Sequence, residues 1–147
     1  MNFVSSILQV KGSDVYSVKK DTPVIDVLDL MAQKGIGAVL VLEDEKIAGI
    51  FSERDFARKV AKTRTLSLDT PVSDLMTKDV FVVSPDETID ECMALMSSSK
   101  IRHLPVVEKE KLVGVISIGD VVRISIEDKN LQIQSMEKYI FGYGYGQ

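Results

Sequence analysis

The stretch Gly49-Ile-Phe-Ser52-Glu-Arg-Asp55 recurs 65 residues later as Gly114-Val-Ile-Ser117-Ile-Gly-Asp120. The same shift aligns the residues around both stretches without a gap, and about a third of the aligned residues are identical, far more than chance gives. The identical pairs include Asp14 and Asp79, Val18 and Val83, Met31 and Met96, Ile36 and Ile101, Val41 and Val106, and Arg58 and Arg123. The 147-residue chain therefore holds two copies of one structural unit.

Each copy predicts the element order strand, helix, strand, strand, helix. A short run of β-branched and aromatic residues predicts the first strand, and apolar residues at helical spacing predict the first helix. Two five-residue apolar runs that flank a charged four-residue turn then predict a hairpin, and a second helix closes the copy. The expected elements are residues 15–18, 24–31, 38–42, 47–51 and 53–62 in the first copy, and 80–83, 89–96, 103–107, 112–116 and 118–126 in the second.

A unit of about 50 residues rarely buries enough apolar surface to fold alone. We therefore expect an α/β (α+β) protein in which two β-α-β-β-α copies pack sheet to sheet with pseudo-twofold symmetry. The expected boundaries are residues 1–65 and 66–126 for the two copies, joined by a polar linker at 63–71, and 127–147 for a tail. Helical spacing of apolar residues predicts an amphipathic helix over 127–140 that packs on the body or on a partner chain. The glycine-rich residues 141–147 predict an irregular end or an aromatic clip on a neighbouring chain.

Composition excludes several classes of protein. A net charge of −4 and a pI near 5.0 argue against nucleic acid as the main partner, because phosphate backbones select clustered lysine and arginine. One cysteine, Cys92, excludes an internal disulfide framework, and one histidine, His103, leaves little for a histidine-built metal site. No stretch approaches the roughly 20 apolar residues that span a bilayer. Residues 1–10 lack the basic start of a secretion signal, so we expect a cytoplasmic protein without a membrane partner.

The repeated Gly-x-x-Ser-x-x-Asp pattern has a structural and a functional interpretation. After a strand, Ser-x-x-Asp is typical of a capping box, in which the serine and the acid satisfy free N–H groups at the start of a helix. The functional interpretation places the acid beside a cleft, where its carboxylate accepts hydrogen bonds from the cis-diol of a ribose. Capping alone requires neither the upstream glycine nor an aspartate in both copies. The doubled pattern therefore favours nucleotide binding.

The doubled unit resembles a tandem pair of cystathionine-β-synthase (CBS) domains, also called a Bateman module, over residues 4–126. The matching stretches are Asp79-Val-Phe-Val-Val-Ser-Pro-Asp-Glu-Thr-Ile, Ile101-Arg-His-Leu-Pro-Val-Val and both Gly-x-x-Ser-x-x-Asp segments. The resemblance implies a ligand sensor that holds adenosine compounds (AMP, ADP, ATP, NAD or S-adenosylmethionine) in two clefts between the copies. It also implies a standalone module that forms a homodimer.

Carried over residue by residue, the resemblance implies two sites. The first is expected to use Asp120 for the ribose hydroxyls, Ser117 for a phosphate or ribose oxygen and Val115 against the base, with Thr22, Ile36 and Gly37 as its other wall. The mirror site is expected to use Asp55, Ser52 and Ile50, with Ser84, Ile101 and Arg102 as its wall. Basic groups expected near phosphates are Arg102, His103, Arg54, Arg58 and Arg123. Gly37 and Ala38 stand where the second copy has Arg102 and His103, so we expect one tighter site and one weaker or empty site.

The leading functional hypothesis is a non-enzymatic regulatory module for energy sensing that passes its signal to an effector protein. The alternative is a structural or protein-docking module whose clefts stay empty. The unit also resembles the regulatory insert of inosine-monophosphate dehydrogenase. That enzyme's chemistry needs a barrel of about 250 residues and a nucleophilic cysteine loop, which this sequence does not supply. We expect Cys92 to be a buried apolar residue rather than a redox group, and we expect neither a catalytic residue nor a metal.

Overall fold

The computed structural model describes residues 2–145. The chain divides into two compact units, each built around one copy of the repeat. The first-repeat unit is Val15–Phe81. The second-repeat unit combines Val82–Gln147 with the N-terminal segment Met1–Asp14. The start of the chain therefore packs with the second copy of the repeat and not with the first.

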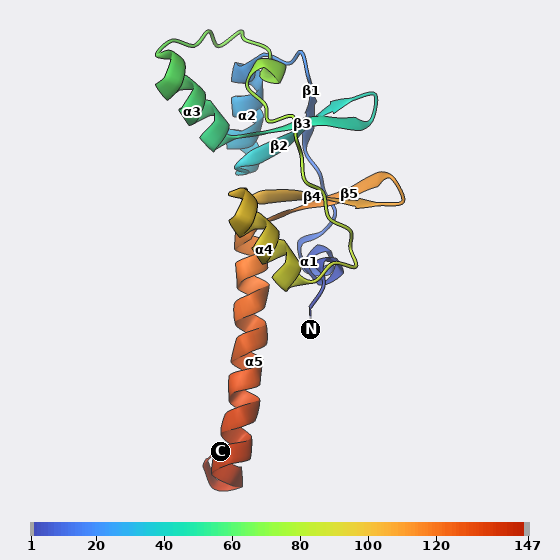
Figure 1. Cartoon of the computed structure of the whole chain (residues 1–147), viewed down its shortest axis with the longest axis vertical. Helices are drawn as coiled ribbons and strands as arrows, with labels where there is room; N and C mark the ends of the chain where they lie inside the picture. The colour runs from blue at the N-terminus through green and yellow to red at the C-terminus, as the bar shows by residue number, and fades with distance from the viewer. Residues whose placement is uncertain (1, 146–147) are drawn as a thin grey trace. The chain divides into compact units, whose positions relative to one another are not determined.

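The first-repeat unit contains a three-stranded sheet, and its core includes residues of that sheet and of the helix at Val24–Lys34. Its elements are β1 (Ser17–Lys19), α2 (Val24–Lys34), β2 (Ala38–Glu43), β3 (Lys46–Ser52), α3 (Glu53–Thr63) and the 3-10 turn η1 (Val72–Asp74) (Figure 1). Strand β1 pairs parallel with β2, and β2 pairs antiparallel with β3. The core consists of Val24, Val27, Met31, Val39, Val41, Phe51, Val72 and Leu75. The apolar side of α2 that the helical spacing predicts is thus the side that is buried.

The second-repeat unit contains the same hairpin and three helices. Its elements are α1 (Val4–Lys11), α4 (Ile89–Ser99), β4 (His103–Glu108), β5 (Lys111–Ser117) and α5 (Ile118–Tyr145). Its core consists of Val4, Ile7, Val83, Ile89, Cys92, Met96, Leu104, Val106, Ile116 and Val121. The Thr88 hydroxyl accepts a hydrogen bond from the Glu91 N–H and so caps α4. Both predicted hairpins and the four helices predicted within the copies are confirmed.

The strand expected at residues 80–83 is wrong except at its last residue. Val83 makes a single parallel bridge to Val106, whereas Phe81 and Val82 are exposed. Pro105 has no N–H to donate to the ladder, whereas Leu40, the equivalent residue of the first copy, donates to the Tyr16 carbonyl at 3.4 Å. The first copy therefore forms β1, although the chain turns after this position in both copies, where the Thr22 N–H donates to the Lys19 carbonyl and the Glu87 N–H donates to the Ser84 carbonyl.

The helix expected at 118–126 does not end there. Helix α5 continues without a break to Tyr145 and extends as a single rod beyond the hairpin of its unit (Figure 1). Residues 127–140 are helical as predicted, although they continue the preceding helix. The irregular segment predicted from residue 141 is wrong as far as residue 145, and residues 146–147 lie outside the described part. A glycine inside a helix costs about 1 kcal/mol relative to alanine. Gly142 and Gly144 stand in its last turn, where this cost does not stop the helix.

Two close contacts explain why glycine stands in both copies of the repeated pattern. Helix α1, which the sequence analysis did not predict, packs against β5 and α5. A Cβ atom on Gly114 would lie 2.6 Å from Cδ2 of Leu8 in that helix. A Cβ atom on Gly49 would lie 2.6 Å from the Met76 sulfur and 2.7 Å from the Thr77 carbonyl oxygen. Packing accounts for glycine at both positions, most strictly at Gly49, where a backbone carbonyl is close, so the glycines no longer support the functional interpretation of the pattern.

The contacts predict unequal costs for the two alanine substitutions. Gly49→Ala forces a backbone carbonyl to move and is expected to lower the free energy of unfolding by about 2–3 kcal/mol. Gly114→Ala meets only the flexible end of a leucine and is expected to cost less than about 1 kcal/mol. Urea unfolding followed by circular dichroism measures both. Equal losses, or a larger loss for Gly114→Ala, would contradict this packing.

Candidate functional site

In each unit the hairpin runs directly into a helix through a serine and an aspartate. Ser52 ends β3, and its hydroxyl accepts a 3.2 Å hydrogen bond from the Asp55 N–H, while its own N–H donates to Asp55 Oδ2 at 2.9 Å. The second junction repeats this geometry, with 3.2 Å from the Asp120 N–H to Ser117 Oγ and 2.8 Å from the Ser117 N–H to Asp120 Oδ2. The capping interpretation is therefore confirmed at both junctions.

Capping engages only one oxygen of each carboxylate. Oδ1 of Asp55 accepts a long 3.3 Å hydrogen bond from the Thr77 hydroxyl. Oδ1 of Asp120 lies 3.6 Å from Nη1 of Arg123, an arginine on the same helix whose side chain is 70% exposed. Both aspartates are half-buried rather than open to bulk water. Each junction thus keeps an acceptor oxygen that can bind a further donor while the helix stays capped.

The wall residues that the sequence analysis names lie close to the junction of their own repeat. The Glu53 N–H donates to the Gly37 carbonyl at 3.1 Å, and the Ile118 N–H donates to the Arg102 carbonyl at 2.8 Å. His103 lies opposite Ser117 in the β4–β5 ladder. Ile36 and Ile101 directly precede Gly37 and Arg102. The assignment of these residues to the acid of the other copy stays a prediction.

The remaining candidate residues take the expected places at the edges of the elements. Thr22 follows β1 and accepts from the Val72 N–H at 2.9 Å, and Ser84 follows the bridge residue Val83. Ile50 and Val115 lie in the third strand of each repeat. The carried-over site residues are half-buried, except the arginines Arg58, Arg102 and Arg123, which are exposed.

Lys11, at the end of α1, is a residue of the second junction that sequence reasoning missed. Its ammonium donates to Asp120 Oδ2 at 2.7 Å and to the Val115 carbonyl at 2.9 Å. Burial of the Asp120 carboxyl raises its pKa. Hydrogen bonds from Lys11 and Ser117 and the charge of Lys11 outweigh that effect, so the pKa is lowered from its ordinary value of 3.8. The carboxylate is therefore ionised at neutral pH.

Thr77 makes the matching contacts at the first junction. Its N–H donates to the Ile50 carbonyl at 2.8 Å and its hydroxyl to Asp55. Ile50 and Val115 are equivalent under the 65-residue shift, as are the two aspartates. One ammonium in the second repeat thus contacts the same carbonyl position and the same aspartate as the neutral amide and hydroxyl of Thr77 in the first, but it binds the capping oxygen Oδ2, whereas the hydroxyl binds Oδ1. The repeat alignment could have drawn attention to Lys11, because it pairs this lysine with the apolar Met76.

A family model for the CBS domain matches residues 5–62 and 72–127, that is, both repeats. The chain belongs to the CBS-domain family. The CBS domain-containing protein CBSX3, mitochondrial, of Arabidopsis thaliana is 34% identical over 152 residues, which cover 97% of this chain and 73% of that protein. A putative signal-transduction protein with CBS domains from Burkholderia ambifaria has a similar structure, with 47% identity and a TM-score of 0.82 over 86% of this chain and 96% of that one. CBSX2 in complex with AMP is 27% identical with a TM-score of 0.68, over 88% of this chain and 99% of that chain.

These similarities identify the protein as a CBS-domain pair of mixed α/β fold. The Arabidopsis and Burkholderia proteins are matched over most of their own length, 73% and 96%. In the part of the chain that the structure describes, no helix is both long and apolar enough to cross a bilayer. The described residues also include no group of three or more side chains suited to hold a metal ion.

Cys92 is fully buried in the core of the second CBS repeat. Burial, with smaller contributions from the negative charges of Glu87 and Glu91, raises the pKa of its thiol to about 11. At neutral pH the thiol is therefore protonated and unreactive. The sequence-based expectation of a buried apolar residue at this position is confirmed.

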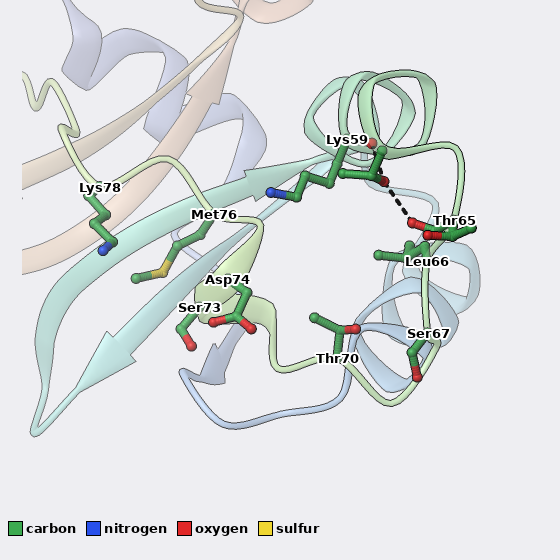
Figure 2. Close-up of a pocket in the computed structure, with 10 residues that line it drawn as sticks. Lys59, Thr65, Leu66, Ser67, Thr70, Ser73, Asp74, Met76 and Lys78 are labelled. Atoms are coloured by element: carbon green, nitrogen blue, oxygen red, sulfur yellow. Dashed lines mark hydrogen bonds between the residues drawn. The ribbon is translucent and has the colours of Figure 1, made fainter.

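The first CBS repeat also carries an open hollow of about 600 Å³ (Figure 2). It is lined by Lys59, Thr63, Thr65, Leu66, Ser67, Thr70, Ser73, Asp74, Met76 and Lys78. None of these is among the candidate site residues carried over from the family. Lys59 lies one helical turn after Asp55 on α3, and Lys78 directly follows Thr77. The hollow therefore borders the chain segments that form the first junction.

Proposed function

We propose that this CBS-domain pair is a non-enzymatic regulatory module that binds an adenine nucleotide and acts on a partner protein through a ligand-dependent conformational change. The observation that carries the proposal is the half-buried aspartate at both strand–helix junctions, Asp55 and Asp120. Each holds its helix cap with Oδ2 and has Oδ1 in weaker contacts that a ligand can replace. A ribose offers two adjacent hydroxyl donors, which suit such a carboxylate.

The relatives support an adenosine compound as the ligand. The solved complex of CBSX2 contains AMP, and the proposed ligands of this chain are AMP, ADP, ATP or NAD, with S-adenosylmethionine as a further candidate. The N-termini of α3 and α5 lie at the two junctions and favour a nearby phosphate. The exposed guanidinium of Arg123, close to Asp120, is suited to bind a phosphate as well.

The proposed output follows from the position of the aspartates. A ligand that binds Asp55 or Asp120 contacts the first turn of α3 or α5. Ligand binding can therefore favour one position of that whole helix over another. A ligand shifts a conformational equilibrium only by the difference in its affinity for the two states. We propose that an effector protein, still to be identified, detects this shift as a measure of cellular energy state, and that the module works in the cytoplasm.

Thermal unfolding with added nucleotide tests the binding proposal. At a hundredfold excess over Kd, a ligand adds about 2.7 kcal/mol of stability, or about 5–10 °C in the melting temperature of a chain of this size. AMP, ATP, NAD and S-adenosylmethionine are each added to wild type, Asp55→Asn, Asp120→Asn and the double variant. We expect a shift for wild type, a smaller shift for each single variant and none for the double variant.

Asparagine is the appropriate substitution because its amide oxygen still accepts the capping hydrogen bond. Each variant is compared with its own melting temperature without ligand, which removes any loss of cap energy from the comparison. If none of the four compounds shifts the melting temperature of the wild-type protein, nucleotide binding is wrong and the alternative of a structural or docking module holds.

Helix α5 supports self-association as part of the proposal. Beyond the hairpin of its unit it exposes Ile126, Leu131, Ile133 and Met136, an unusual number of large apolar side chains for one helix. Ile126 and Ile133 are seven residues apart, and Met136 follows three residues later, which is typical of a helix–helix seam. The same exposed residues favour the alternative of a docking module.

We expect light scattering coupled to gel filtration to give a mass of about 33 kDa, twice the 16.3 kDa of the chain. Ile133→Glu and Met136→Glu together are expected to weaken the dimer, whereas Gln134→Glu, at an exposed position on another side of the helix, is expected to leave it intact. A wild-type mass of about 16 kDa at micromolar concentration would contradict self-association.

A further inference from the structure

The two junctions present the same acceptors to donors of different charge. At the second junction the Lys11 ammonium bridges the Val115 carbonyl and the Asp120 carboxylate. At the first, the neutral N–H and hydroxyl of Thr77 make the equivalent contacts. We call Lys11, Val115, Ser117 and Asp120 the lysine half-site, and Ile50, Ser52, Asp55 and Thr77 the threonine half-site.

A ribose that binds Asp120 must compete with Lys11. The ammonium holds the same Oδ2 atom that accepts from the Ser117 N–H, and the Asp120 side chain is only 12% exposed. Oδ2 of Asp120 already accepts from the Ser117 N–H and from the Lys11 ammonium, which together use both of its lone pairs, so a ribose that donates one hydroxyl to each carboxylate oxygen competes with Lys11 for Oδ2. The ribose therefore displaces Lys11 from all or part of its ion pair.

The displaced ammonium then determines which ligands bind well. An ammonium that leaves the carboxylate of Asp120 loses a favourable charge–charge contact, and a phosphate of the ligand can replace that contact. The Lys11 side chain is 40% exposed and carries a flexible four-carbon stem, so it can turn from the aspartate toward a ligand phosphate. Neutral adenosine offers no such anion, and the sulfonium of S-adenosylmethionine adds a like charge.

We propose that Lys11 makes the lysine half-site more selective for adenine nucleotides that carry a phosphate than the threonine half-site, where Thr77 brings no charge to the aspartate. This inference rests on the proposed nucleotide binding. It goes further by specifying the charge of the ligand that each half-site prefers. It also gives a physical reason for unequal affinities at the two sites, since the ion pair between Lys11 and Asp120 must open when a ribose binds the lysine half-site.

Isothermal titration with AMP and adenosine at constant ionic strength tests the proposal. In Asp55→Asn, which leaves the lysine half-site, we expect AMP to bind at least about tenfold more tightly than adenosine. Adding Lys11→Met, which keeps the length of the side chain and removes its charge, is expected to reduce this ratio to about threefold or less. Lys11→Arg is expected to keep the ratio, because the charge is retained.

Two controls separate this effect from a general loss of positive charge. In Asp120→Asn, which leaves the threonine half-site, Lys11→Met is expected to leave the AMP-to-adenosine ratio unchanged. Lys111→Met removes an exposed lysine at the hairpin tip of the same unit and is expected to leave the ratio of the lysine half-site unchanged. Circular dichroism confirms that each variant is folded before titration.

The outcomes distinguish this inference from the proposed function. If AMP and adenosine bind but Lys11→Met does not change their ratio in Asp55→Asn, the role of Lys11 is wrong and nucleotide binding stands. If neither compound binds the wild-type protein, both proposals are wrong.

Discussion

The position of a single carboxylate at each strand–helix junction is the constraint on which the proposed site depends. Asp55 and Asp120 each fasten a helix to the end of a hairpin through a serine three residues earlier. A side chain in this role is held in one rotamer and cannot turn into bulk water. The same restraint that caps the helix also orients the second oxygen, so a structural and a binding role are compatible in one residue.

Each CBS repeat is completed by a segment that precedes the other repeat in sequence. The segment around Met76 and Thr77 lies on β3 of the first repeat and requires Gly49 there, and α1 lies on β5 of the second, where Leu8 approaches Gly114 closely. These two segments differ in sequence far more than the repeats do. They therefore bring different donors, Thr77 and Lys11, to equivalent acceptors, and this difference makes the two junctions chemically unequal.

Features encoded locally could be predicted from the sequence, and features that depend on distant packing could not. The hairpins and the helices from Val24, Glu53 and Ile89 follow from apolar spacing and from charged turns within each copy. The strand at 80–83 is overpredicted because its own apolar residues do not reveal that the neighbouring strand carries Pro105, which has no N–H to donate to it. The end of α5 was placed too early because glycine was given too much weight near the end of a helix. Lys11 was missed because its contact joins residues 109 apart in sequence, and no local pattern records such a pair.

The most direct test of the account is a crystal structure of the protein grown with AMP. The account predicts ribose hydroxyls within hydrogen-bonding distance, about 2.7 Å, of the carboxylates of Asp55 and Asp120, with the serine–aspartate caps intact. At the second junction, Lys11 is predicted to have moved from Asp120 toward the phosphate. AMP bound through its ribose at another place, with both carboxylates still confined to their present partners, would contradict the central claim.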